Sequence, residues 1–205
     1  MPYAADHSAE TRRRIVESAR HLFNRRGFTE VSIDEIMAGA GLTRGGFYHH
    51  FKTKDELYAE AISFALTCNP VERITGRPSC PDQSRDGLMR GLIQAYLSRE
   101  HLSATDEHCA LFALPSDVAR ASVTVREAYQ NVLLAMARLF ERGLGNDDED
   151  ARRKSLALAA ICVGGMTLAS TVADNRLAED IRKAALDTAM ELLPGTPAAI
   201  RTAAE

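Results

Sequence analysis

Apolar side chains recur every three or four positions along most of this chain, which is the spacing of one face of an α-helix. No long stretch alternates between apolar and polar residues, so the pattern predicts no β-strand. Longer helices are predicted near residues 88–96, 125–140, 155–173 and 177–193, and an irregular connection is predicted at 68–82. We therefore expect an all-α protein.

The first 66 residues are predicted to form shorter helices with recognisable ends. Apolar residues between Ile15 and Phe23 mark the first helix, and Gly27 offers it a C-terminal cap. Residues 32–35 and 53–56 have the composition of capping boxes, in which a hydroxyl and a carboxylate satisfy the free amides at a helix start. Both boxes predict that a helix begins directly after them.

Residues 32–50 have the layout of a helix-turn-helix: a short capped helix, a turn containing glycine, and a second short helix. Phe47 and Phe51 lie four positions apart and are expected to anchor the second helix to the core. Arg44 and Tyr48 are also four apart, on another face. An arginine can donate to guanine edges and a tyrosine can reach phosphate, so this face suits DNA.

Other groups of the same segment suit the DNA backbone. Gly45 and Gly46 each weaken a helix by about 1 kcal/mol relative to alanine. They indicate either a close approach of the backbone to the major groove, which we favour, or flexibility tolerated in a packed helix. Thr43 is expected to cap the second short helix. Candidate donors to phosphate are Thr43, His49, His50 and Lys54.

Charge is distributed unevenly along the chain. Hydrophobic residues make up 45% and charged residues 26%, which is typical of a soluble globular protein and excludes a disordered tail. Residues 11–54 hold nine Lys/Arg and four Asp/Glu, a balance of +5, although the net charge of the chain is -3. A basic quarter indicates either a polyanionic partner or an ordinary solvated surface, and charge alone does not separate the two.

The remaining sequence signals favour a cytoplasmic protein with reduced thiols. The N-terminal residues contain no apolar signal region, and Cys68, Cys80, Cys109 and Cys162 form no Cys-x-x-Cys pair. Residues 155–173 carry no charge and are long enough to cross a membrane. Because they are rich in alanine, with glycine, serine and threonine, we expect a helix buried in a core or a subunit interface and no membrane partner.

Residues 29–36 and 40–57 resemble the N-terminal domain of TetR/AcrR-family transcriptional regulators. The residues that match are Tyr48, His50, Phe51, Lys54 and Leu57. The resemblance implies an all-helical homodimer that binds double-stranded DNA at a palindromic operator. It also implies a three-helix DNA-binding domain over residues 1–55 and a helical ligand-binding and dimerisation domain over 56–205.

The same resemblance assigns roles in DNA binding. The implied contacts are base edges for Arg44, Gly45 and Gly46; the DNA backbone for Tyr48, His50 and Lys54; phosphate for Ser32, which also caps a helix; and a variable contact for His49. Asp34 departs from the pattern, because many relatives have a neutral or basic residue there. A carboxylate at this place either accepts from a cytosine amino group or repels phosphate, and the sequence leaves both open.

The residues after 55 offer a candidate pocket for a small, mostly apolar effector. The same side chains would also simply fill a core, and periodicity does not distinguish the two. Cys109, next to His108, is either a sensor of electrophiles with a lowered thiol pKa or, as we favour, a small buried hydrophobe. The candidate lining residues are Tyr96, His108, Cys109, Phe112, Tyr129, Leu133, Met136, Phe140, Cys162 and Met166.

Small residues on the last two helices favour a dimer interface of four helices, or else burial within one subunit. His101 and His108 complete no usual set of metal ligands. No nucleophile elbow, P-loop or dinucleotide motif is present, so we expect no enzyme activity, no metal and no cofactor. The sequence therefore predicts a ligand-responsive repressor. The alternative is a DNA-bound regulator controlled by a protein partner or by modification of Cys109.

Overall fold

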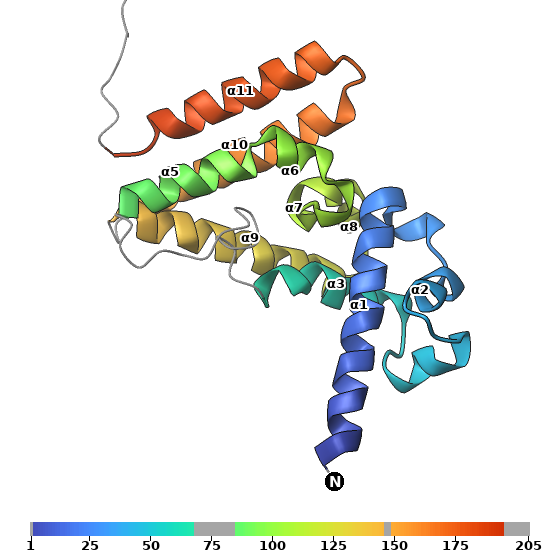
Figure 1. Ribbon diagram of the computed structural model, residues 1–205. Coiled ribbons are helices and arrows are strands. Elements are labelled where there is room, and N and C mark those ends of the chain that lie inside the picture. Colours follow the sequence, from blue (N-terminus) through green and yellow to red (C-terminus); the bar gives the residue numbers. More distant parts are fainter. Residues whose placement is uncertain (1, 68–84, 146–148, 195–205) are drawn as a thin grey trace, which may run out of the picture. The chain divides into compact units, whose positions relative to one another are not determined.

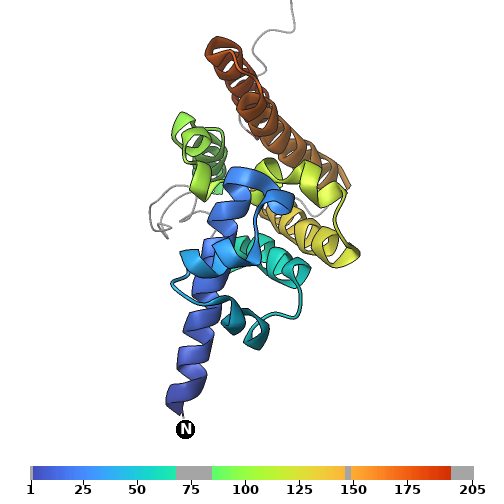
Figure 2. The same ribbon diagram turned by 90° about the vertical axis from the view of Figure 1, so that its right-hand side faces the viewer.

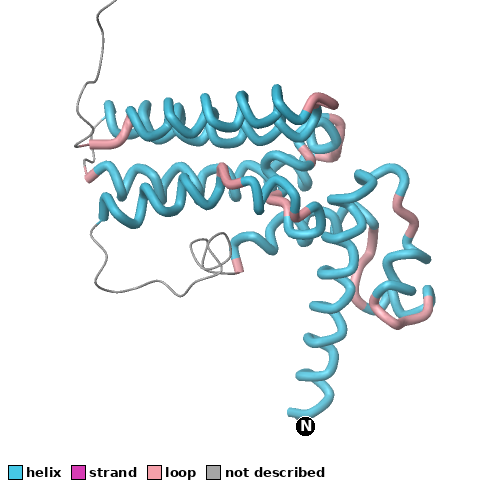
Figure 3. Tube along the Cα trace, turned by 45° about the horizontal axis from the view of Figure 1, so that its top comes forward, coloured by secondary structure: helices cyan, strands magenta, loops and turns pink. Residues whose placement is uncertain are grey.

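The computed structural model describes residues 2–67, 85–145 and 149–194. These residues form helices and loops, with no strand among them, which confirms the all-α prediction (Figure 3). The chain divides into two compact units. One comprises Met1–Asn69 and Ala104–Leu133, and the other comprises Pro70–Ser103 and Leu134–Glu205. The first unit therefore combines the N-terminal residues with a segment from the middle of the chain, and the functional division expected near residue 55 stays a prediction.

The N-terminal part of the first unit is a small helical head. Its elements are α1 (Pro2–Glu30), α2 (Ile33–Gly39), the 3-10 helix η1 (Arg44–His49), α3 (Lys54–Ser63) and a 3-10 turn η2 (Phe64–Leu66). The short α2 packs against the long α1, and η1 packs against α2 (Figure 2). Ile15 and Phe23 of α1, Ile36 of α2 and Phe47 of η1 are fully buried and form the core between them.

The capping boxes begin their helices as predicted, with one difference. At α2, the Ser32 hydroxyl accepts from the Glu35 amide at 3.2 Å, and the Glu35 carboxylate accepts from the Ser32 amide at 2.8 Å. At α3, the Thr53 hydroxyl accepts from the Glu56 amide, but the Glu56 carboxylate accepts from the backbone amide of Lys52 instead of that of Thr53. The second box therefore closes one residue earlier than the usual pattern.

The second helix of the helix-turn-helix is a six-residue 3-10 helix and not an α-helix. Thr43 stands at its N-cap position, but its side chain makes no capping hydrogen bond, so the predicted Thr43 cap is wrong. Short length and the two weak helix formers Gly45 and Gly46 account for the tighter, less regular form.

A kink at Gly27 ends the straight part of α1, as predicted. Its φ of 75° and ψ of 177° belong to a backbone region that only glycine adopts without strain. Beyond the kink, the Phe28 amide donates to the Asp117 carboxylate at 2.9 Å. A Cβ added at Gly27 would lie 2.5 Å from Oδ2 of Asp117, so both the dihedral angles and the space require glycine.

The middle segment of the first unit consists of short helices before a long one. They are the 3-10 turn η3 (Thr105–Glu107), α7 (Ala110–Ala113), α8 (Pro115–Ala119) and the start of α9 (Val123–Leu144). Pro115 begins α8, at a position where a missing amide hydrogen costs nothing. The Tyr129 hydroxyl of α9 donates to the Leu111 carbonyl at 2.6 Å and fixes α7 to α9.

The second unit contains α5 (Arg85–Tyr96), α6 (Arg99–Ser103), the end of α9, α10 (Glu149–Thr171) and α11 (Asn175–Glu191). The last two helices run antiparallel, side by side (Figure 1). They approach closely at Gly165, where an added Cβ would lie 2.5 Å from Cβ of Ala185. Buried Arg182 of α11 donates to the Leu97 carbonyl and pairs with Glu179, which fixes α11 to the end of α5.

The helices predicted after residue 85 are confirmed with boundaries that differ by a few residues, and the connection predicted at 68–82 lies outside the described residues. Within the described ranges, one helix has the length and mean hydropathy of a membrane span, over Asp150–Thr171. Core helices of soluble proteins meet the same criterion. Leu158, Cys162 and Met166 of this helix are buried within the chain, as expected of a core helix.

Replacing Gly27 with alanine tests the kink. The positive φ and the contact with Asp117 predict that Gly27→Ala lowers the free energy of unfolding by about 1–3 kcal/mol. Gly91→Ala is the matched control, because no atom lies within 4 Å of the added Cβ and the residue is helical. That control is expected to raise stability by up to about 1 kcal/mol. Urea unfolding measures the free energy of unfolding of both variants. Equal values for the two would contradict the conclusion that position 27 requires glycine.

Candidate nucleic-acid interface

Polar side chains of α1 hold the two short helices in place. Three of them donate to backbone carbonyls at or near the C-terminal ends of α2 and η1: Arg12 to His50, Arg14 to Ala40 and Ser18 to Ile36. The last carbonyls of a helix have no partner within the helix, so the bonds from Arg12 and Arg14 satisfy groups that short helices leave exposed. The Ile36 carbonyl, in contrast, also accepts from the Ala40 amide. Arg12 also pairs with Glu60 of α3 at 2.5 Å. Its guanidinium lies 4.0 Å from the centre of the Phe51 ring.

Opposite faces of η1 have different environments. Phe47 and Phe51 are buried, with ring centres 5.7 Å apart, which confirms that they anchor η1. Tyr48 is 61% exposed and the Arg44 side chain is 60% exposed. Gly45 and His49 are also exposed. The structure therefore presents to solvent the face that the sequence analysis assigned to DNA, and the individual DNA contacts remain predictions.

Lys54 has partners within the head itself. Its ammonium group donates to the Phe28 carbonyl and lies 4.2 Å from the centre of the Phe28 ring. Partial burial lowers the pKa of Lys54. The predicted phosphate contact of Lys54 therefore remains a prediction. The structure adds a second role, which is to fix the end of α1 to the start of α3.

Charge at the start of α2 is balanced by local hydrogen bonds. The amide and hydroxyl of Ser32 donate to the Glu35 carboxylate, and Arg26 pairs with it at 2.8 Å. These donors lower the pKa of Glu35 to about 2, and the Ser32 amide has the largest effect. In the same domain, burial and then the charge of Arg12 lower the pKa of His50, which favours a neutral imidazole at neutral pH.

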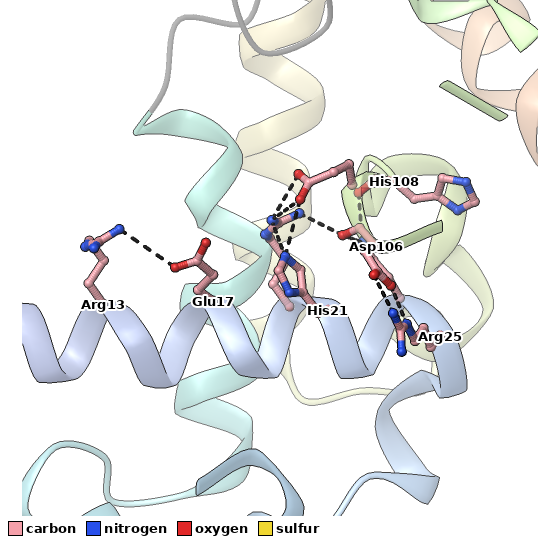
Figure 4. Close-up of polar contacts among 9 residues, drawn as sticks. Arg13, Glu17, His21, Arg25, Asp106 and His108 are labelled. Atoms are coloured by element: carbon pink, nitrogen blue, oxygen red, sulfur yellow. Dashed lines mark hydrogen bonds and ion pairs between the residues drawn. The ribbon is translucent and has the colours of Figure 1, made fainter. Parts of the chain in front are cut away.

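A second polar cluster fastens α1 to residues 104–108, and Figure 4 shows it. Arg25 pairs with the Asp106 carboxylate, and Arg20 pairs with Glu107 at 3.0 Å. Backbone carbonyls take part as well. The Asp106 carbonyl accepts from the side chains of Arg20 and Asn24, and the His108 carbonyl accepts from the Asn24 side chain. Sequence reasoning missed this cluster, because its partners lie more than 80 positions apart and no local pattern joins them.

The candidate pocket residues divide between the two compact units. Those in the first unit are His108, Cys109, Phe112, Tyr129 and Leu133, and those in the second are Tyr96, Met136, Phe140, Cys162 and Met166. Within the first, the rings of His108 and Phe112 lie 4.7 Å apart. Six of the ten side chains are buried: Tyr96, Cys109, Phe112, Phe140, Cys162 and Met166. That all ten line one cavity stays a prediction.

No group of three His, Cys, Asp or Glu residues that could hold a metal is present within the described ranges. His101 belongs to the second unit, where its Nδ1 lies 2.8 Å from the Tyr96 carbonyl, and His108 belongs to the first. The chemistry available at the head is therefore hydrogen bonding and charge, on a surface formed by η1 and the start of α2.

A family model described as bacterial regulatory proteins of the tetR family matches residues 15–61, which include all of the helix-turn-helix. The chain belongs to the TetR family. The matched residues contain the family's helix-turn-helix, which is a DNA-binding motif.

Curated relatives agree with this assignment. HTH-type transcriptional repressor Rv1474c of Mycobacterium tuberculosis is 32% identical over 90 residues, which is 44% of each chain, so this match spans less than half of that relative's length. HTH-type transcriptional regulator TtgR of Pseudomonas putida is 26% identical over 94% of this chain and 96% of its own. The similarity to the first relative is thus partial, and the similarity to the second extends over nearly both chains.

Solved structures show that the fold extends beyond the head. The reduced form of Escherichia coli NemR has a TM-score of 0.74 over 92% of this chain and 99% of its own, with 19% identity. A TetR-family regulator from Cytophaga hutchinsonii has a TM-score of 0.73 over 93% of this chain and 98% of its own, with 14% identity. At such low identity these likenesses establish the helical fold of this TetR-family chain and nothing about its effector.

The Glu35 carboxylate predicts a pH dependence of stability. Its pKa is lower in the folded protein than in the unfolded chain, so its contribution is complete above about pH 4.3 and is lost as pH falls towards 2. We expect Glu35→Gln to be less stable than wild type at pH 6, and the difference to close near pH 2. Glu30→Gln is the control, since Glu30 has no ion pair among the described residues. Urea unfolding across pH checks this, and a gap that persists at pH 2 would contradict it.

Burial predicts that Cys109 reacts slowly. Its side chain is 2% exposed and Cys162 is fully buried, and burial raises the pKa of the Cys162 thiol to about 12. We expect iodoacetamide to alkylate both positions much more slowly in the native protein than in urea, as measured by peptide mapping. Rapid native alkylation of Cys109 with loss of DNA binding would instead support the sensor hypothesis.

Proposed function

We propose that this TetR-family regulator is a repressor that binds a palindromic operator as a homodimer, and that a small, mostly apolar molecule releases it. The observation that carries DNA binding is the two-sided η1: Phe47 and Phe51 are buried, and Arg44 and Tyr48 point to solvent. An arginine and a tyrosine on one exposed face supply a donor to base edges and a group for phosphate.

Repression is supported by the names of similar proteins. The relatives from Mycobacterium tuberculosis include two that are named transcriptional repressors, Rv1474c and KstR2. A repressor of this size needs no contact with polymerase, because occupation of a promoter by a bound dimer is sufficient. The proposal therefore takes repression as the default sign of regulation.

The homodimer is supported by exposed apolar side chains on the last helices. Leu156 and Leu168 of α10 and Leu177 of α11 are between 41% and 57% exposed. Burial of such side chains against a second copy would remove apolar surface from water. Two-fold symmetry then places the two heads on half-sites about 34 Å apart, or a multiple of that distance.

Release by an effector is supported by the contacts within the first unit. Residues 104–108 are fastened to α1 by the ion pairs of Arg20 and Arg25, and Asp117 of α8 accepts from Phe28. A ligand that shifts the middle segment would therefore pull on the helix that holds η1. Such a ligand must bind the DNA-incompetent state more tightly, with a coupling of about 1–3 kcal/mol in typical cases.

Binding to DNA from the chain's own promoter region, with a salt titration, tests the proposal. We expect a dimer on a palindromic site and a steep loss of affinity with salt. Arg44→Ala should cost about 1–3 kcal/mol of binding free energy and relax specificity, and Lys54→Ala should weaken all sequences alike and lower the salt slope by about one per protomer.

Two controls make this experiment decisive. Lys54→Ala also removes the contact with Phe28, so its thermal unfolding is measured in parallel to separate loss of the head from loss of a phosphate contact. Small apolar molecules are then titrated into the DNA complex. Normal operator binding by Arg44→Ala would refute the role of η1, and a complex that no small molecule dissociates would favour control by a protein partner.

A further inference from the structure

One ion pair joins the two helices of the helix-turn-helix on their exposed side. Nη1 of Arg44, the first residue of η1, lies 2.5 Å from Oδ2 of Asp34 in the first turn of α2. The Asp34 side chain is 55% exposed, so the pair lies on the surface that the proposed function assigns to DNA.

Folding stability does not explain this pair. Exposed ion pairs contribute little to stability, because water screens the charges and both side chains lose freedom. The short helices are held by other bonds: Arg12 and Arg14 of α1 donate to carbonyls at the ends of η1 and α2. In contrast, the Asp34 carboxylate is the one partner of Arg44 among the described residues. The fold therefore does not depend on this pair, and both side chains are available for contact with DNA.

The geometry of a guanidinium explains how such a pair can recognise a base. Arginine presents five N–H donors in a planar fork, and one of its nitrogens is held by Asp34. The remaining donors are available to guanine, whose O6 and N7 accept two parallel hydrogen bonds in the major groove. A side chain already held in place loses less freedom on binding, so the carboxylate prepares Arg44 for one orientation.

Charge leads to the same conclusion. A lone carboxylate at this surface would be repelled by phosphate, whereas a paired one is neutralised by Arg44. A lone Arg44 would be attracted to any phosphate, whatever the sequence. Together the two groups carry no net charge, so their contact with DNA would contribute to sequence discrimination more than to general affinity.

We infer that Asp34 is a specificity-determining residue, which holds the Arg44 guanidinium towards the base edge of a guanine and away from phosphate. The inference rests on the proposed function, namely binding of η1 in the major groove. It predicts that Asp34 acts through Arg44 and makes no separate contact with a base.

Selection from a randomised double-stranded DNA library tests this with the full-length protein. The proteins compared are wild type, Asp34→Asn, Arg44→Ala and the control Glu30→Gln. Asp34→Asn and Glu30→Gln each remove one exposed negative charge from the head, and only the first removes the partner of Arg44. Affinities are then measured, over a range of salt, for the selected site and for a site changed at the position that depends on Arg44.

We expect wild type and Glu30→Gln to select guanine at one position of each half-site, and Arg44→Ala to lose that preference. Asp34→Asn should lose preference at the same position, with the affinity ratio between guanine and other bases falling by roughly tenfold. Its binding to unrelated DNA should tighten, and its salt slope should steepen by about one per protomer, because Arg44 now reaches phosphate. Asp34→Glu, which keeps the carboxylate, should restore part of the preference.

Three results would overturn the inference in distinguishable ways. Unchanged discrimination by an Asp34→Asn protein that unfolds like wild type would show that Arg44 needs no partner. Loss of a cytosine preference at a position that Arg44→Ala retains would show that Asp34 reads a base by itself. Failure of wild type to select any sequence would refute the proposed function, and this inference with it.

Discussion

The head depends on the satisfaction of carbonyl groups that its two short helices leave exposed. Helices of seven and six residues are too short to be stable alone, because nucleation is costly and few internal bonds follow it. Arg12 and Arg14 of α1 donate to carbonyls at their ends, and Phe47 fixes η1 from the inside. The surface that presents Arg44 is therefore built on the long helix and not on the helix-turn-helix itself.

The same long helix also binds the middle of the chain. About two to four turns beyond Arg12, the side chains of Arg20, Asn24 and Arg25 bind residues 104–108. A kink at Gly27 then turns the chain so that Phe28 reaches Asp117. The recognition elements and the middle segment therefore share one scaffold. A displacement of the segment would change contacts of the helix that holds η1, and the proposed coupling of a ligand to DNA binding rests on these contacts.

Local chemistry could be predicted from the sequence, and distant pairing could not. The capping pattern of residues 32–35, the turn at Gly27 and the buried Phe47 follow from neighbours within a few positions, and the structure confirms them. The pair of Asp34 with Arg44 and the bond from Lys54 to Phe28 depend on how helices pack, which no periodicity encodes. The 3-10 form of η1 could be predicted only in part. Its two glycines indicate a weak helix, but they do not indicate whether that helix is α or 3-10.

Counting charges also overstated the attraction of the head for DNA. Of the nine Lys/Arg in residues 11–54, six pair with carboxylates: Arg12, Arg13, Arg20, Arg25, Arg26 and Arg44. Arg14 and Lys54 are bonded to backbone carbonyls, so only Lys52 lacks a partner within the described ranges. Most of the positive charge is thus used to hold the fold. The proposed recognition of DNA therefore depends on the placement of a few groups on η1, and the basic excess contributes less than its size suggests.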